Sequence, residues 1–286
     1  MASQSRKVQR VIEPAATSDG AGVRLKRSIA TRTLDYLDPF LLFDHFGSDD
    51  PDDYIAGFPM HPHRGIETVT YMLAGEVRHR DSIGHAGTIA AGDVQWMTAG
   101  RGILHEEMPQ LRGGRLDGFQ LWVNLPAKLK MSRPRYQEVA ARDIPVVTHA
   151  GGVQVRVIAG RVGTVSGAVR EIAADPEYLD VAMPAQTAFT QPVAQGHTAF
   201  AYLYEGEAKF GVGDGEPGTV IQGPRLVVFA DGDEVRVASG GQGAHFLLIS
   251  GKPLNEPVVR YGPFVMNTRQ EIEQTLRELQ DGSFIR

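Results

Sequence analysis

Short strand-like runs, each ended by glycine, aspartate or proline, fill most of this chain of 286 residues. Runs such as "ETVTYML", "QLWVNL" and "AFAYLY" are rich in β-branched and aromatic residues, and several alternate apolar with polar side chains. The 33 glycines and 17 prolines are spread through the sequence and are not pooled in one linker. Many short strands joined by turns are typical of a β-sandwich or barrel. We therefore predict an all-β fold.

A faint internal repeat divides the chain. "YMLAGE" at 71–76 resembles "YLYEGE" at 202–207, and each is followed by a Gly-Asp turn, in "AAGDVQWM" at 90–97 and in "ADGDEVRV" at 230–237. Strand, Gly-Glu turn, strand, Gly-Asp turn and strand therefore occur twice. We predict a duplicated β-barrel, with the join around residues 130–150.

Only the C-terminal segment has the pattern of a good helix. Its signals are a cap, an apolar stripe at helical spacing and a final glycine. They are supplied by Asn267 or Thr268, then Ile272, Leu276 and Leu279, and last Gly282. We expect one short helix here.

Composition excludes several classes of protein. The 29 basic and 34 acidic residues are mixed along the chain, which gives no electrostatic footprint for nucleic acid. There are no cysteines, so any metal must be bound by histidine or carboxylate. No segment has the apolar run of a signal peptide or a membrane span. We expect a cytoplasmic protein without membrane or nucleic-acid partners.

Two pairs of polar residues carry the chemistry. In "FPMHPHRGIET" (58–68), His61 and His63 share one face of a strand, and in "MTAGRGILHEEMP" (97–109) His105 and Glu107 do the same. If the two strands are neighbours, three imidazoles and one carboxylate converge. Such a set suits a divalent transition metal with open coordination positions, whereas a closed zinc site fills all four. Single histidines elsewhere are expected at the surface or satisfied in the core: His45, His79, His85, His149 and His197.

These segments resemble the pirin family of bicupins. The similarity lies in "FPMHPHRGIETVTYMLAGEVRHRDSIGHAG", "GDVQWMTAGRGILHEEMP", "FQLWVNLPAK" and the tail "EPVVRYGPFVMNTRQEIEQ", and it spans residues 24 to 281. The resemblance implies two tandem cupin (jelly-roll) barrels packed together, with a short C-terminal helix. We expect a metal-binding domain at residues 1–140 and a metal-free domain with the helix at 141–286.

The resemblance also implies the ligands. By motif they are His61, His63, His105 and Glu107, around one divalent ion: Fe(II) first, with Ni, Mn, Cu, Co and Zn as alternatives. A generic cupin takes its carboxylate from the first motif, which makes Glu67 the rival, since it is also in phase with His63. In the second barrel the positions that match His61 and His63 fall near Pro192 and Ala194, and if His245 matches His105, Leu247 replaces Glu107. That barrel is expected to be structural.

Two functions follow from the resemblance. The first is a metal-dependent dioxygenase, of the quercetin 2,3-dioxygenase type, that opens a flavonol with O2 while Glu107 accepts a proton from the substrate. The second is a metal-containing, redox-sensing regulator that binds a protein partner. We expect an apolar wall beside the metal from Phe58, Met60, Met97, Ile103 and Met108.

Overall fold

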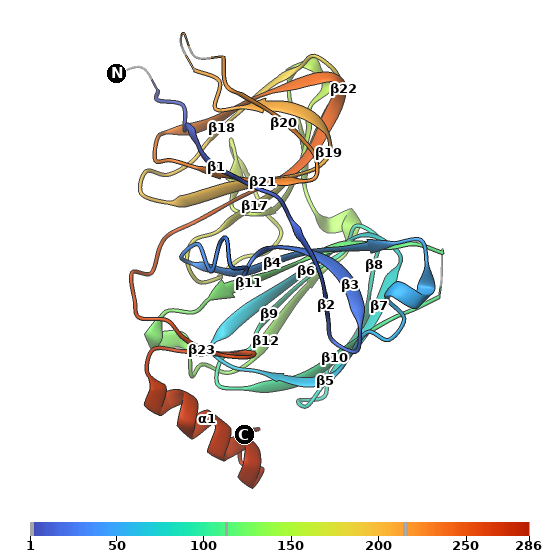
Figure 1. Cartoon of the computed structure of the whole chain (residues 1–286), viewed down its shortest axis with the longest axis vertical. Helices are drawn as coiled ribbons and strands as arrows, with labels where there is room; N and C mark the ends of the chain where they lie inside the picture. The colour runs from blue at the N-terminus through green and yellow to red at the C-terminus, as the bar shows by residue number, and fades with distance from the viewer. Residues whose placement is uncertain (1–2, 112–113, 214, 216, 286) are drawn as a thin grey trace. The chain divides into compact units, whose positions relative to one another are not determined.

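The computed structural model describes residues 3–111, 114–213, 215 and 217–285, and strands dominate it (Figure 1). The chain forms two compact units. The first unit holds residues 15–141 together with 254–286, and the second unit holds the residues up to Pro14 together with 142–253. The predicted all-β fold of two units with one C-terminal helix is confirmed, and each unit is built from open antiparallel sheets whose strand order is compatible with a jelly roll.

The grouping differs from the expected division at both ends of the chain. Strand β1 (Val8–Ile12) pairs with β21 (Arg225–Phe229), so the start of the chain completes the sheet of the second unit. The C-terminal tail, residues 254–286, belongs to the first unit. The N-terminal segment joins the second unit because β1 forms backbone hydrogen bonds with the edge strand β21, and no local pattern in the sequence predicts this pairing.

The first unit has two sheets. The larger has the order β12-β9-β6-β11-β4-β3-β2 and the smaller has the order β5-β10-β7-β8. The strands of the larger sheet are β2 (Ala15–Asp19), β3 (Val23–Ile29), β4 (Phe40–Ser48), β6 (Ile66–Ala74), β9 (Val94–Thr98), β11 (Leu116–Asn124) and β12 (Arg135–Val139). Those of the smaller sheet are β5 (Phe58–His63), β7 (Glu76–Asp81), β8 (Ala86–Ala90) and β10 (Ile103–Pro109).

The second unit repeats this order. Its main path is β1-β21-β19-β22-β17-β14-β13, while β18 pairs with β22 and β20 with β19. The strands are β13 (Val146–Thr148), β14 (Gln154–Ala159), β17 (Glu177–Met183), β18 (Ala188–Pro192), β19 (Thr198–Phe210), β20 (Thr219–Gln222) and β22 (Glu234–Gly251), with a small pair β15 (Arg161–Val162) and β16 (Val165–Ser166). The short 3-10 turns of the chain are η1 (Pro51–Asp53), η2 (Ala127–Leu129), η3 (Ala141–Asp143) and η4 (Ala150–Gly152).

Strand pairing relates the two units position by position. Strand β22 occupies the places of both β10 and β11, because its first half pairs with β18 and its second half with β17. Likewise β19 occupies the places of β6 and β7, since it pairs with β22, β21 and β20. The internal repeat is therefore a repeat of topology.

The tail of the chain ends in the expected helix. After β23 (Val259–Tyr261) and β24 (Phe264–Met266), α1 runs over Arg269–Asp281. Thr268 caps it through a capping box with Glu271, and Gly282 ends it in the left-handed conformation. The apolar stripe is narrower than expected: Ile272 is buried but Leu279 is exposed. Polar side chains on the helix are buried in its place, for a reason given below.

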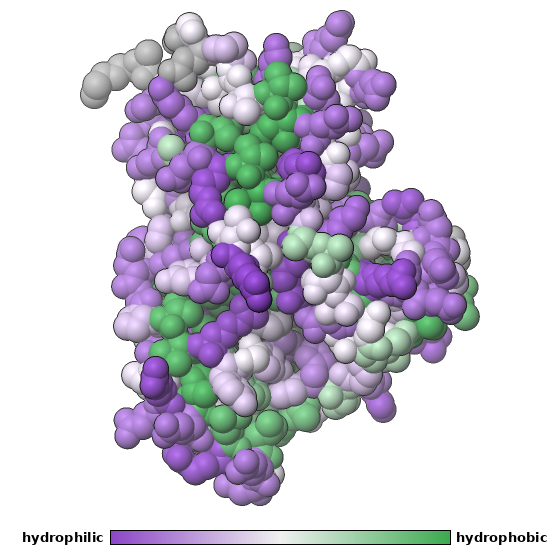
Figure 2. All heavy atoms as spheres, viewed as in Figure 1, coloured by the Kyte–Doolittle hydropathy of each residue, from purple (hydrophilic) through white to green (hydrophobic). Residues whose placement is uncertain are grey.

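Polar residues cover most of the face shown in Figure 2, with apolar residues gathered in patches between them. Some apolar surface remains on any folded protein. Among the residues that the structure describes, no helix combines the length and apolar character needed to cross a membrane.

Candidate metal centre

Three histidines of the first unit meet on two neighbouring strands. β5 and β10 pair antiparallel with His61 opposite His105, and His63 lies two residues further along β5 on the same face. The ring centroid of His105 lies 4.4 Å from that of His61 and 5.0 Å from that of His63. Each of the three rings offers one nitrogen, and these nitrogens all lie within 4.8 Å of one another. No other such group of histidines and carboxylates occurs in the described part of the chain.

The hydrogen bonds of these rings indicate what they can bind. His61 Nδ1 lies 2.9 Å from the carbonyl oxygen of Pro59, so Nδ1 carries the proton of the neutral ring and Nε2 keeps its lone pair. That Nε2 lies 3.0 Å from Nε2 of His63. At this distance one shared proton, or a cation bound by both lone pairs, can lie between the two nitrogens.

The third ring points to the same conclusion. Both nitrogens of His105 are buried and have no hydrogen-bond partner in the described structure, which is costly for a polar group. Burial lowers the pKa of His63 and of His105 well below its usual value, and the neighbouring imidazoles lower it further. Neutral rings with free lone pairs are what a metal requires. The three histidines fit a divalent metal ion.

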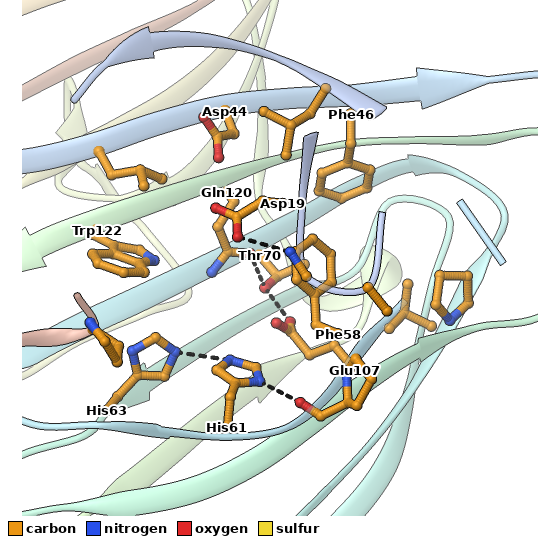
Figure 3. A pocket seen from close by; sticks show the side chains of 18 of the residues that line it. Asp19, Asp44, Phe46, Phe58, His61, His63, Thr70, Glu107, Gln120 and Trp122 are labelled. Carbon is orange, nitrogen blue, oxygen red and sulfur yellow. Dashed lines mark hydrogen bonds between the residues drawn. The ribbon is translucent and has the colours of Figure 1, made fainter. Parts of the chain in front are cut away.

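Glu107 lies in the same pocket but not in the same group of atoms. It follows His105 on one face of β10, is nearly buried, and lines the cavity with His61 and His63. Its Oε1 accepts a hydrogen bond from the hydroxyl of Thr70, at 3.0 Å. Figure 3 shows the carboxylate and the imidazoles turned toward one space. The structure thus brings three of the four expected ligands together and places the fourth beside them, so ligation by Glu107 stays a prediction.

Glu67 has a different environment. Its Oε1 accepts from the hydroxyl of Thr98 at 2.8 Å, and its Oε2 accepts from the indole N–H of Trp96 at 3.0 Å. It is 1% exposed, and burial raises its pKa. On β6 it is three residues from Thr70, which lines the pocket, so the two side chains lie on opposite faces of the sheet. Its phase with His63 is lost because Gly65, with φ of 79°, breaks the strand between them.

The pocket beside the histidines has a volume of about 520 Å³, is mostly apolar and lies within the first unit (Figure 3). Of the five residues expected to form its wall, only Phe58 does. Met97 and Ile103 pack in a separate buried cluster, and Met60 is exposed. The apolar wall comes instead from other strands: Leu25, Leu42, Phe46, Val77, Leu116 and Trp122.

Charged residues form a further part of this wall. Arg27 holds Asp44 with two hydrogen bonds of 2.8 and 2.6 Å, and its Nη2 also donates to Asp19. Burial raises the pKa of Asp44. In Figure 3, Asp19 and Asp44 lie on the side of the pocket away from His61 and His63. A ligand that reaches across the pocket therefore meets carboxylates at its far end.

Arg64, which follows His63, explains the buried polar face of α1. Its Nη2 donates to Glu278 Oε2 at 2.7 Å and its Nη1 to Thr275 Oγ1 at 3.0 Å. Its guanidinium carbon lies 4.5 Å from the ring centroid of Phe284. The helix thereby holds the turn that follows the two histidines. The sequence shows an arginine after His63, but it cannot show that this arginine pairs with Glu278, 214 residues away.

In the second unit, apolar residues and an amide occupy the equivalent positions. The pairing of β18 with β22 sets Phe189 opposite Val237 and Gln191 opposite Val235. When Gly206 is aligned with Gly75, as in the internal repeat, Phe210 corresponds to His79, so their partners Val237 and Glu107 also correspond. Val235 then corresponds to His105, and Gln191 to His61, one residue before the expected Pro192. The expected match at His245 is wrong, because β22 has the place of two strands and His245 lies in its second half.

The other histidines lie outside this group and most of them contact carboxylates or aromatic rings, although both ring nitrogens of His79 and Nε2 of His149 are buried without a hydrogen bond in the described structure. His45 Nε2 lies 2.9 Å from Asp117, and His79 Nε2 lies 2.7 Å from Glu138. The rings of His85 and His149 lie against Tyr136 and Phe189. These contacts support the interpretation that they are structural.

Comparisons with known proteins agree with this description. Residues 22–123 match the Pirin family model, and residues 178–285 match the Pirin C-terminal cupin domain. A pirin-like protein of Caulobacter vibrioides is 46% identical over 280 residues, which are 98% of this chain and 99% of that protein. A Pseudomonas aeruginosa protein with the provisional name quercetin 2,3-dioxygenase is 48% identical over 269 residues, 93% of each chain. A quercetin 2,3-dioxygenase from Acinetobacter baumannii, whose crystal structure is known, is 34% identical in sequence to this chain. The two structures superpose with a TM-score of 0.88 over 98% of each chain.

Proposed function

This chain belongs to the pirin family, and from that premise we propose that its first unit is a metal-dependent dioxygenase that opens a flavonol such as quercetin with O2. One observation carries the proposal. Three imidazoles converge, and two of them, His61 and His63, line a mostly apolar pocket of about 520 Å³. A pocket of this size and character suits a small aromatic ligand.

The proposed ligand set is His61, His63, His105 and Glu107. Three imidazoles and one carboxylate suit Fe(II), with Ni, Mn, Cu, Co and Zn as alternatives, and leave positions open for exogenous oxygen ligands. When bound, the ion acts as a Lewis acid and template for the substrate's adjacent hydroxyl and carbonyl oxygens and for O2.

Residues of the pocket bind the substrate, exclude water and accept the substrate's proton. Phe58 and Trp122 line the pocket and can contact the aromatic rings, and the apolar wall excludes water from the reacting centre. Glu107 accepts the proton of the flavonol hydroxyl, which leaves the ring system electron-rich and ready for attack by O2. One oxygen molecule is consumed for each flavonol, carbon monoxide leaves, and the proton returns to the ester product.

The test is turnover of quercetin by protein of measured metal content. Oxygen uptake and carbon monoxide release in a one-to-one ratio, in proportion to the bound metal, would support the proposal. Fully metal-loaded protein that binds flavonols but consumes no oxygen, with each metal ion supplied in turn, would reject it and favour the regulatory alternative.

A further inference from the structure

The hydroxyl of Thr70 lies between two acceptors. Its oxygen is 3.0 Å from Oε1 of Glu107 and 2.8 Å from Oε1 of Gln120. Thr70 is 3% exposed, so water does not take over either contact. A hydroxyl has one proton, so it cannot donate to both oxygens at once.

A half-turn of the Gln120 amide resolves the conflict. When Glu107 is ionised, the threonine proton goes to the carboxylate, because a hydrogen bond to a charged acceptor is the stronger one. The amide then turns its Nε2 to the threonine oxygen, since the oxygen and nitrogen of an amide are interchangeable in shape. The series of hydrogen bonds then runs from Gln120 through Thr70 to Glu107. The amide oxygen of Gln120 faces the pocket that this residue lines, where it can accept a hydrogen bond from a ligand.

The fold fixes this arrangement through strand register. Thr70 on β6 is the direct partner of Gln120 on β11 in the larger sheet, and Glu107 reaches them from β10 of the smaller sheet. Thr68 lies on the same face of β6, is equally buried, and has no hydrogen bond to Glu107 in the described structure. It offers a matched control.

We propose that Thr70 is a positioning residue for Glu107, and that Gln120 sets the direction of the threonine hydroxyl. The hydroxyl holds one carboxylate oxygen toward β6, which leaves the other oxygen to be aimed at the histidines and the substrate. The activity part of the test rests on the proposed flavonol oxygenation, but the spectroscopic part does not.

The experiment compares Thr70→Val, which removes the hydroxyl at constant shape, with Thr70→Ser, which keeps it, and with Thr68→Val. Each protein is loaded with Co(II), whose visible spectrum depends on ligand geometry. We expect the Thr70→Val spectrum to change while the other two match the wild type. With the active metal, we expect kcat to fall roughly 10–100-fold in Thr70→Val, as is usual for groups that orient a metal-site residue, with KM within a few-fold. Thr70→Ser should restore both.

A flavonol added without oxygen provides a third readout, because its absorption moves to longer wavelength when its hydroxyl loses a proton. The shift should be complete in wild type and Thr70→Ser, and reduced in Thr70→Val. A Thr70→Val protein with the wild-type Co(II) spectrum would overturn the proposal, as would equal losses in Thr70→Ser or Thr68→Val. If no flavonol is bound or oxidised by any variant, the dioxygenase proposal fails, and the Co(II) spectra still decide the role of Thr70. If Thr70→Val does not fold, Gln120→Leu replaces it, with a smaller loss of the same kind.

Discussion

The two units share one strand order and differ in what fills the equivalent positions. Where the first unit has His61 opposite His105, the second has Gln191 opposite Val235. The interior of the second unit is a continuous apolar core that includes Phe189, Val237 and Phe246. The interior of the first unit is divided between small apolar clusters and the pocket beside the histidines. The same backbone thus supports a metal centre in one copy and a plain core in the other.

The difference has an energetic meaning. Buried histidines without partners destabilise the metal-free first unit, and metal binding removes that penalty. Val235 and Val237, which face β18 in the second unit, are apolar and carry no such penalty. We therefore expect changes at equivalent positions to affect metal and activity in the first unit, and stability alone in the second.

The largest expected effect is on catalysis. Glu107→Gln keeps a neutral oxygen donor but removes the proton acceptor, so flavonol oxygenation should fall by about 10²–10⁴-fold. Metal binding by Glu107→Gln should be weaker than in the wild type but still measurable. The matched control is Glu67→Gln, whose side chain lies on the opposite face of β6 and is hydrogen-bonded to Trp96 and Thr98. Its activity should stay within a few-fold of the wild type. If instead Glu67→Gln abolishes metal binding while Glu107→Gln does nothing, the ligand set follows the generic cupin pattern.

The next effect concerns stability. Arg64→Met leaves Glu278 buried without its cation, since the two side chains are 3% and 7% exposed, and should lower the free energy of unfolding of the first unit by about 3–5 kcal/mol. Urea unfolding followed by tryptophan fluorescence reports on this unit alone, because both tryptophans lie in it.

Its counterpart in the second unit is Arg236, which pairs with Glu234 and is 26% exposed. Arg236→Met should cost about 1 kcal/mol or less. Equal losses from the two arginine substitutions would show that α1 does not hold the metal-binding turn.

A smaller effect is expected at the position equivalent to His61. Gln191 is buried and donates to the carbonyl oxygen of Arg161 at 3.0 Å and to Glu177 at 3.3 Å. Gln191→Leu leaves both acceptors without this donor, so the second unit should lose about 1–3 kcal/mol, seen by circular dichroism in urea. Metal content and the fluorescence transition should not change. Any loss of metal would mean that the units are not independent in the way their interiors suggest.

Strand periodicity could predict the three histidines, because His61, His63 and His105 lie on regular strands that pair directly. The same rule failed for Glu67, because Gly65 ends one strand before the next begins, in another sheet. The contact of Thr70 with Glu107 could not be predicted either, because Thr70 faces Glu107 across the interior from a strand of the other sheet.

The overall fold could be predicted as all-β and duplicated from the short runs and the repeated turns. The exchange of terminal segments could not, because pairing of β1 with β21 depends on contacts over 200 residues apart in sequence. For the same reason, alignment by residue spacing matched His245 to His105, whereas strand pairing places His245 in the half of β22 that has the place of β11.

The most direct test is metal analysis of purified wild type, His63→Ala and His245→Ala. His63 belongs to the three-histidine group, while His245 lies on β22 opposite Ala182 and outside that group. We predict a single divalent metal ion per chain in wild type and in His245→Ala, and its near-complete loss in His63→Ala. Full retention of metal in His63→Ala together with its loss in His245→Ala would contradict the assignment of the metal centre to the first unit.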